Sequence, residues 1–258
     1  MVVTPDRIAY SGLLGPPSQR LIGAVTIYLA LDSPFVISFE GEPEQSAWLA
    51  VVMPNENHKI ASNDRLVRDM LIEPESVALP LSPGLSSRTL TTRTAEYDRL
   101  RSAFDKWLCE DLREGIDTPG FDRMFFGAAL RPRVVDRRIE RVVHRIRSCP
   151  HEQFSAAECA RLTGLSFSRF VHLFKEEIGM TFRAFCAWKR ARAVLPWMTT
   201  RCNLTHLALE AGYPDSTHFS HSIRRIFGHR PRDIVAGSQR LALQCTATKM
   251  PTHPPFFV

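Results

Sequence analysis

The first 95 residues contain short runs of β-branched and aromatic residues, separated by Pro, Gly, Asn and acidic residues. Runs of this length and spacing are typical of an antiparallel barrel or sandwich. They cover residues 20–31, 34–41, 47–54 and 65–76. The pattern predicts a β-rich N-terminal domain, followed by a loop over residues 79–89 that is rich in Pro, Gly and Ser.

From residue 95 onward the apolar residues recur at three- and four-residue intervals. This spacing predicts an amphipathic helix over residues 95–114 and another over residues 135–147, with a domain boundary near residue 130. The stripe of the first helix can pack on its own β domain or against a second copy of the chain. The second alternative makes it a candidate dimer interface, formed by Leu100, Phe104, Trp107 and Leu108.

The C-terminal half contains an internal repeat. Gly164 and Gly212 lie 48 residues apart, and after one inserted residue the offset becomes 49, as for Phe170 and Phe219. A repeat of this length indicates two copies of one supersecondary unit. Each copy has the parts of a helix-turn-helix: a short helix, a glycine suited to the left-handed turn, a capping residue, and a second helix with one apolar face.

Polar residues mark where the helices of these units begin. Ser155 and Glu158 have the S-x-x-E spacing of a capping box. Further helix starts are expected at Ser166, at Asn203, and at Pro214 or Asp215. Thr181 can cap a helix that joins the units and runs to Met198, and Pro196 is expected to kink or stop that helix.

The second helix of each copy carries mostly small polar, imidazole and basic side chains outside its apolar face. They are Ser168, Arg169, Val171, His172 and Lys175 in the first copy, and Ser216, Thr217, His218, Ser220, His221, Arg224 and Arg225 in the second. Short polar and imidazole groups can bond base edges in a major groove, and arginines can contact phosphates. Because a catalytic pocket rarely exposes a whole helix face of this kind, the pattern favours nucleic-acid binding.

The charge distribution agrees with this interpretation. Residues 1–130 carry a net charge of −6 and residues 131–240 one of +11, within an overall +6. A basic region of this size is typical of a nucleic-acid binder. The six cysteines form no zinc pattern, and no apolar run approaches the roughly 20 residues of a membrane helix. With no secretory pattern at the N-terminus, we expect a cytoplasmic protein with reduced cysteines and no metal or cofactor.

With these residues in view, residues 136–234 resemble the DNA-binding domain of the AraC/XylS family of bacterial transcription regulators. The stretch LALEAGYPDSTHFSHSIRRIFGHRP is similar to that family's signature of Ala, Gly-aromatic, a polar turn, Phe-Ser, a basic pair, Phe-Gly and Pro. The resemblance implies two units that enter successive major grooves. It implies base contacts from Ser168, Val171, His172, Ser216, Thr217, His218, Ser220 and His221, and phosphate contacts from Arg169, Lys175, Arg224 and Arg225.

The N-terminal half resembles, more loosely, the cupin-like sensor domains of many relatives. His58, in the segment LAVVMPNENHKI, is the candidate ligand-binding residue, and no set of metal ligands accompanies it. The predicted fold is α+β, with a cupin-like barrel plus helix and an all-α domain whose two helix-turn-helix units are joined by a linker helix. The predicted domains are a sensor (1–94), a helical dimerisation or linker region (95–130), the DNA-binding domain (131–238) and a disordered tail (239–258).

The expected function is sequence-specific binding of double-stranded DNA by a transcription regulator that is not an enzyme. We expect a homodimer that responds to a small-molecule effector or another partner and contacts RNA polymerase. The alternative is a cupin-type metal enzyme with a basic accessory domain. That alternative needs a His/Glu cluster in residues 20–80, where His58 is the only histidine.

Overall fold

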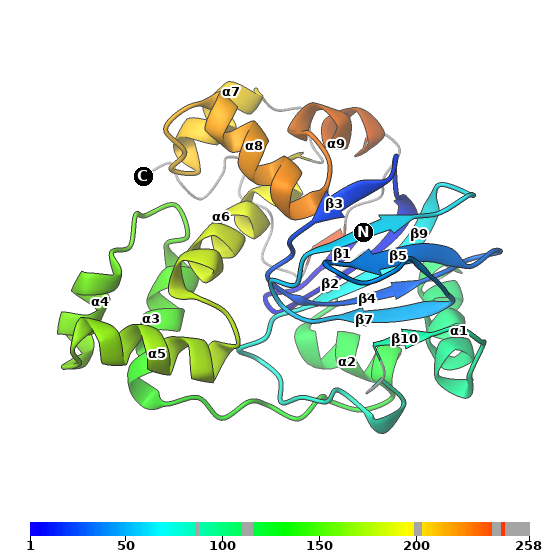
Figure 1. The fold of residues 1–258 in the computed structure, drawn as a ribbon, viewed down its shortest axis with the longest axis horizontal. Helices are drawn as coiled ribbons and strands as arrows, with labels where there is room; N and C mark the ends of the chain where they lie inside the picture. Colours follow the sequence, from blue (N-terminus) through cyan, green and yellow to red (C-terminus); the bar gives the residue numbers. More distant parts are fainter. Residues whose placement is uncertain (86–87, 110–115, 199–202, 239–243, 246–258) are drawn as a thin grey trace. The chain divides into compact units, whose positions relative to one another are not determined.

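The computed structural model describes residues 1–85, 88–109, 116–198, 203–238 and 244–245. The chain divides into two compact units (Figure 1). The N-terminal unit consists of Met1–Pro132 and includes the strand Gln244–Cys245, and the C-terminal unit spans Arg133–Gln239. Within the described residues, no helix is long and apolar enough to cross a membrane.

The N-terminal unit is built from two sheets. The larger sheet has the order β10 (Thr89–Leu90), β7 (Leu49–Val52), β4 (Val25–Leu29), β9 (Leu66–Ile72), β2 (Arg7–Leu13), β1 (Val2–Val3) and β11 (Gln244–Cys245). The smaller sheet has the order β3 (Ser18–Arg20), β8 (His58–Ala61), β5 (Phe35–Phe39) and β6 (Gln45–Ala47). Neighbouring strands are antiparallel, except that β11 runs parallel to β1.

The predicted cupin-like β domain takes the form of two mainly antiparallel sheets, and the described strands do not close into one barrel. No described strand is hydrogen-bonded into both sheets, so each sheet ends in its own edge strands. The two sheets meet through side chains instead, as between Tyr28 of β4 and both Phe35 of β5 and His58 of β8. The N-terminal unit is therefore a sandwich. Of the tail predicted to be disordered, the structure describes β11, a pairing that the prediction did not include.

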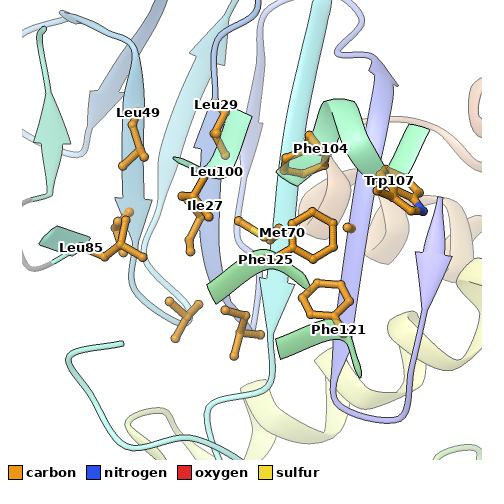
Figure 2. Packing of buried hydrophobic residues seen from close by; sticks show 14 of the residues in the cluster. Ile27, Leu29, Leu49, Met70, Leu85, Leu100, Phe104, Trp107, Phe121 and Phe125 are labelled. Atoms are coloured by element: carbon orange, nitrogen blue, oxygen red, sulfur yellow. The ribbon is translucent and has the colours of Figure 1, made fainter. Parts of the chain in front are cut away.

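Two helices cover the other face of the larger sheet (Figure 2). They are α1 (Ala95–Cys109) and α2 (Thr118–Phe126), and the last part of the predicted first helix, residues 110–114, lies outside the described residues. The rings of Phe104 and Phe125 pack edge to face, with their centroids 5.0 Å apart. This aromatic layer lies on apolar side chains of the central strands, among them Ile27 and Met70, and together they form the core of the unit.

The dimer interface predicted on α1 is wrong for three of its four residues. Leu100 and Phe104 are fully buried and Trp107 is 4% exposed, all within the N-terminal unit itself. A second copy could reach them only by displacing the sheet on which they pack. Leu108 is 50% exposed and does not belong to this core. The alternative interpretation, in which the stripe packs on its own β domain, is the one that the structure confirms.

A buried ion pair fixes α2 to β2. Arg7 Nε donates to Asp122 Oδ1 at 2.8 Å and Arg7 Nη2 donates to Oδ2 at 3.2 Å, with both side chains almost completely buried. Oδ2 also accepts a hydrogen bond from the backbone N–H of Leu130. A buried charge is strongly destabilising without a partner, so the pair favours the arrangement in which α2 and the segment at Leu130 stay attached to β2.

Helices are the regular secondary structure of the C-terminal unit within its described residues. Its helices are α3 (Arg137–Ser148), α4 (Ala156–Thr163), α5 (Phe167–Ile178), α6 (Phe182–Met198), α7 (Leu204–Glu210), α8 (Ser216–Phe227) and α9 (Pro231–Ser238). Helix α6 packs against helices from both halves of the unit. Phe185 of α6 contacts Phe174 of α5, with ring centroids 5.4 Å apart. Further along α6, Trp188 contacts Phe227 of α8 at 5.9 Å.

Pro196 neither stops α6 nor ends its packing. The helix continues through this proline to Met198, and Met198 is fully buried. The joining helix predicted from the sequence is therefore one continuous element. It places the two helix-turn-helix units on a common support.

Candidate nucleic-acid interface

The backbone of the turn repeats between the two helix-turn-helix units. The N–H of Leu165 donates to the carbonyl of Ala160 at 2.9 Å, and the N–H of Tyr213 donates to the carbonyl of Ala208 at 3.0 Å, with the same offset of 48. In each turn a glycine takes the left-handed conformation, with φ 68° at Gly164 and 76° at Gly212. The repeat read from the sequence is thus a repeat of local structure.

Side-chain caps begin the helices of both units. Ser166 accepts a hydrogen bond from the N–H of Arg169 at the start of α5, and Asn203 accepts one from the N–H of Thr205 at the start of α7. At the start of α8, Asp215 Oδ1 accepts from the N–H groups of Thr217 and His218, at 2.7 and 2.8 Å. These bonds satisfy N–H groups that have no partner inside the helix.

The predicted capping box at Ser155 is wrong. Ser155 has the extended backbone of a capping residue, but its side chain makes no capping hydrogen bond. The helix starts from the backbone alone, with the N–H of Cys159 donating to the carbonyl of Ser155 at 3.0 Å. Glu158 lies in the first turn, where a negative charge interacts favourably with the helix dipole.

The apolar faces of the two second helices are buried as predicted. In α5 they comprise Phe170, Leu173 and Phe174, and in α8 Phe219, Ile223 and Phe227. The ring of Phe219 packs edge to face on Tyr213 from the preceding turn, at 5.2 Å. Because these faces are committed to the core, the opposite faces of α5 and α8 remain available to a ligand.

The predicted DNA-contacting residues lie mostly on those opposite faces. The exposed ones are Ser168, Arg169, His172 and Lys175 on α5 and Ser216, Thr217, His218, His221, Arg224 and Arg225 on α8. Val171 and Ser220 are half-buried. Val171 packs against the apolar core of the first unit, which leaves less of it for a base contact.

Sequence reasoning missed Phe167. This ring is 58% exposed although it is large and apolar, and it occupies the first turn of α5 beside Ser168. At the offset of 49 it corresponds to Ser216, which was included among the candidates. Carrying the repeat back by one position would have found it. An exposed aromatic ring at this position can contact the methyl group of thymine.

The first turn of α8 carries a carboxylate–imidazole contact. Asp215 Oδ2 lies 2.8 Å from Nδ1 of His218, and both side chains are more than half exposed. Hydrogen bonds from the backbone N–H and the imidazole of His218 hold the pKa of Asp215 below its ordinary value. The carboxylate therefore stays ionised beside the imidazole.

The ligand-binding role predicted for His58 is not supported. His58 is almost fully buried in the sandwich, where Nε2 lies 2.9 Å from the hydroxyl of Tyr28 and Nδ1 lies 2.9 Å from the carbonyl of Glu56. Burial and the nearby Arg20 lower the pKa of His58 to about 3, so it is neutral. Both ring nitrogens are used within the unit, which leaves neither for a ligand. No metal-binding group of three or more His, Cys, Asp or Glu was found among the described residues.

Comparison with known proteins identifies the C-terminal unit. Residues 159–236, from α4 into α9, match the family described as "Helix-turn-helix domain". This part of the chain is therefore a helix-turn-helix domain, a class in which the second helix of each unit commonly enters the major groove of DNA. No curated protein matches the sequence.

Solved structures extend the likeness to both units. The fold is similar to that of an apo ToxT variant from Vibrio cholerae strain SCE256, with a TM-score of 0.63, 9% identity, and coverage of 92% of this chain and 99% of that chain. It is similar to ToxT from Vibrio cholerae O395, with a TM-score of 0.60, 10% identity, and coverage of 92% and 99%. At these identities the likeness concerns the fold. The helix-turn-helix match agrees with the resemblance read from the sequence for residues 159–236.

Proposed function

We propose that the protein binds specific double-stranded DNA sites by inserting α5 and α8 into successive major grooves. The observation that carries this proposal is the pair of matched, exposed polar faces on two helices that pack against one continuous helix, α6. Ser168 and His172 on α5, and Ser216, Thr217, His218 and His221 on α8, supply groups that can bond base edges. Arg169, Lys175, Arg224 and Arg225 supply phosphate contacts.

The N-terminal unit is proposed to control this DNA binding through a small molecule or another protein. The fold likeness to ToxT, which covers 92% of this chain and so includes the N-terminal unit, supports a regulatory arrangement. Homodimerisation, contact with RNA polymerase and a cytoplasmic location belong to the same proposal. If two copies pair, the buried residues of α1 do not form the dimer interface, because they pack against the larger sheet of the same chain.

Salt dependence tests the DNA-binding mode. Contacts between basic side chains and phosphates release counterions, so the logarithm of the binding constant should fall linearly with the logarithm of the salt concentration. Arg224→Ala should weaken binding to all sequences alike and reduce the slope by about 1. The matched control is Lys59→Ala, which removes one positive charge from the N-terminal unit and should leave the slope unchanged. Binding that does not respond to salt would overturn the proposal.

A further inference from the structure

Asp215, the capping residue of α8, binds the side chain of His218 as well as backbone N–H groups of the helix. Asp215 divides its two oxygens between these tasks: Oδ1 accepts the N–H groups of Thr217 and His218, and Oδ2 faces Nδ1 of His218 at 2.8 Å. The imidazole is therefore fixed against the first turn, and its side chain remains 69% exposed. The first turn is the part of a recognition helix that contacts base edges.

This contact determines which ring nitrogen carries the proton. An ionised carboxylate can only accept hydrogen bonds, so the nitrogen that faces Asp215 must be the donor. In neutral His218 the proton consequently lies on Nδ1, and Nε2 is an acceptor. In the major groove, the groups that donate to such an acceptor are the N6 amino group of adenine and the N4 amino group of cytosine.

We infer that His218, oriented by Asp215, selects an adenine or a cytosine through Nε2 at one position of the DNA site. The inference rests on the proposed DNA-binding function and names the base chemistry of one contact within it. Asp215 does not itself touch the base. It is a positioning residue that fixes the direction and the protonation pattern of the imidazole.

The first unit lacks this arrangement. At the offset of 49, Asp215 corresponds to Ser166 and His218 corresponds to Arg169. Ser166 caps α5 through its hydroxyl, and it has no second oxygen with which to hold a neighbouring side chain. Arg169 has donors only. The two recognition helices therefore present opposite hydrogen-bonding character at equivalent positions, an acceptor on α8 and donors on α5.

Selection of bound sites from random DNA tests the inference, with the full chain at about pH 8.5. For the unsubstituted protein, we expect one position at which adenine or cytosine exceeds the other bases by about tenfold. His218→Ala should abolish the preference at that position and leave the other positions within about twofold. Asp215→Ser should weaken the same preference, because serine keeps the cap and releases the imidazole.

The outcomes separate this inference from the proposed function. A preference for guanine or thymine that depends on His218 overturns the inference, as does an unchanged profile in His218→Ala. A full preference in Asp215→Ser overturns the positioning role. Asp215→Ser also removes a negative charge, which should strengthen binding to all sequences equally. This general effect is therefore distinguishable from a change in preference at one base position. If the unsubstituted protein selects no sequence at all, the proposed function itself fails. Thermal unfolding verifies that both variants are folded.

Discussion

The hydroxyl of Tyr28 donates a hydrogen bond to Nε2 of His58 across 2.9 Å, and this bond joins the two sheets of the N-terminal unit. The direction follows from the other ring nitrogen, because Nδ1 faces the carbonyl of Glu56 and must carry the proton. Burial raises the pKa of Tyr28 to about 12 and lowers that of His58 to about 3. Both groups are therefore neutral at physiological pH.

A buried carboxyl lies beside this contact. Asp69 of β9 is opposite Tyr28 in the larger sheet, and burial raises its pKa to about 7 against the opposing influence of Arg20. Because the pKa is raised, ionised Asp69 lowers the free energy of unfolding at pH values above about 7. This destabilisation disappears as the pH falls from about 7 to 3.8, the ordinary pKa of an aspartate. The lowered pKa of His58 acts in the other direction. Neutral His58 makes its full contribution to the stability above pH 6.5. This contribution is lost as the pH falls from 6.5 toward the pKa of about 3 in the folded protein.

We predict that these two contributions oppose each other between about pH 6.5 and pH 4, so that removing either group leaves the effect of the other. Asp69→Asn removes the carboxyl contribution, and this variant should lose on the order of 3 kcal/mol over that interval. His58→Gln should gain stability over the same interval. Urea unfolding of the full chain at a series of pH values measures both slopes. Two variants with the same pH profile would contradict the prediction.

The sequence predicted the C-terminal unit better than the N-terminal one, for reasons visible in particular residues. Local backbone chemistry determines the turns at Gly164 and Gly212 and the caps at Ser166 and Asp215. The repeat shows the same turn-and-cap pattern in both copies, which makes it easier to recognise. Strand β2 was missed because RIAYSGL has no clear alternation of apolar and polar residues. Helix α2 was missed because TPGFDRMFF begins with residues typical of a turn.

Two other errors came from patterns that fit more than one structure. The apolar stripe of α1 is the same whether it meets its own sheet or a second copy, and only the tertiary arrangement decides between them. His58 follows a turn, as an exposed ligand would, yet its strand directs it into the sandwich. Neither the path of that strand nor the position of Tyr28 opposite it is encoded in the neighbouring residues.

The two turn glycines should respond differently to substitution. A Cβ at Gly212 would lie 2.1 Å from the carbonyl oxygen of His151, whereas one at Gly164 would meet nothing within 4 Å. Gly164→Ala should therefore cost about 1–2 kcal/mol for the left-handed conformation alone. Gly212→Ala adds a clash with backbone and should cost more than about 3 kcal/mol. Urea unfolding compares the two variants, and equal losses would show that the His151 backbone moves aside freely.

The buried face of α8 should be essential for folding of the C-terminal unit. Phe219 is 1% exposed, and Phe219→Ala should lower the free energy of unfolding by about 3–5 kcal/mol through lost burial and a cavity. Leu209→Ala is the matched control, since Leu209 on α7 is 56% exposed and its truncation should cost less than about 0.5 kcal/mol. Denaturant unfolding of both variants checks the difference. Similar values for the two would mean that Phe219 is not part of the core.

The central claim is that two recognition helices bind one DNA site, and the sequence selected from random DNA by the full chain tests it most directly. We predict two conserved elements whose centres are about 10 base pairs apart, one helical turn. His172→Ala on α5 should relax base preference in one element only, and His221→Ala on α8 in the other only, each by about 1–3 kcal/mol. A single element, or two variants that alter the same bases, would contradict the account.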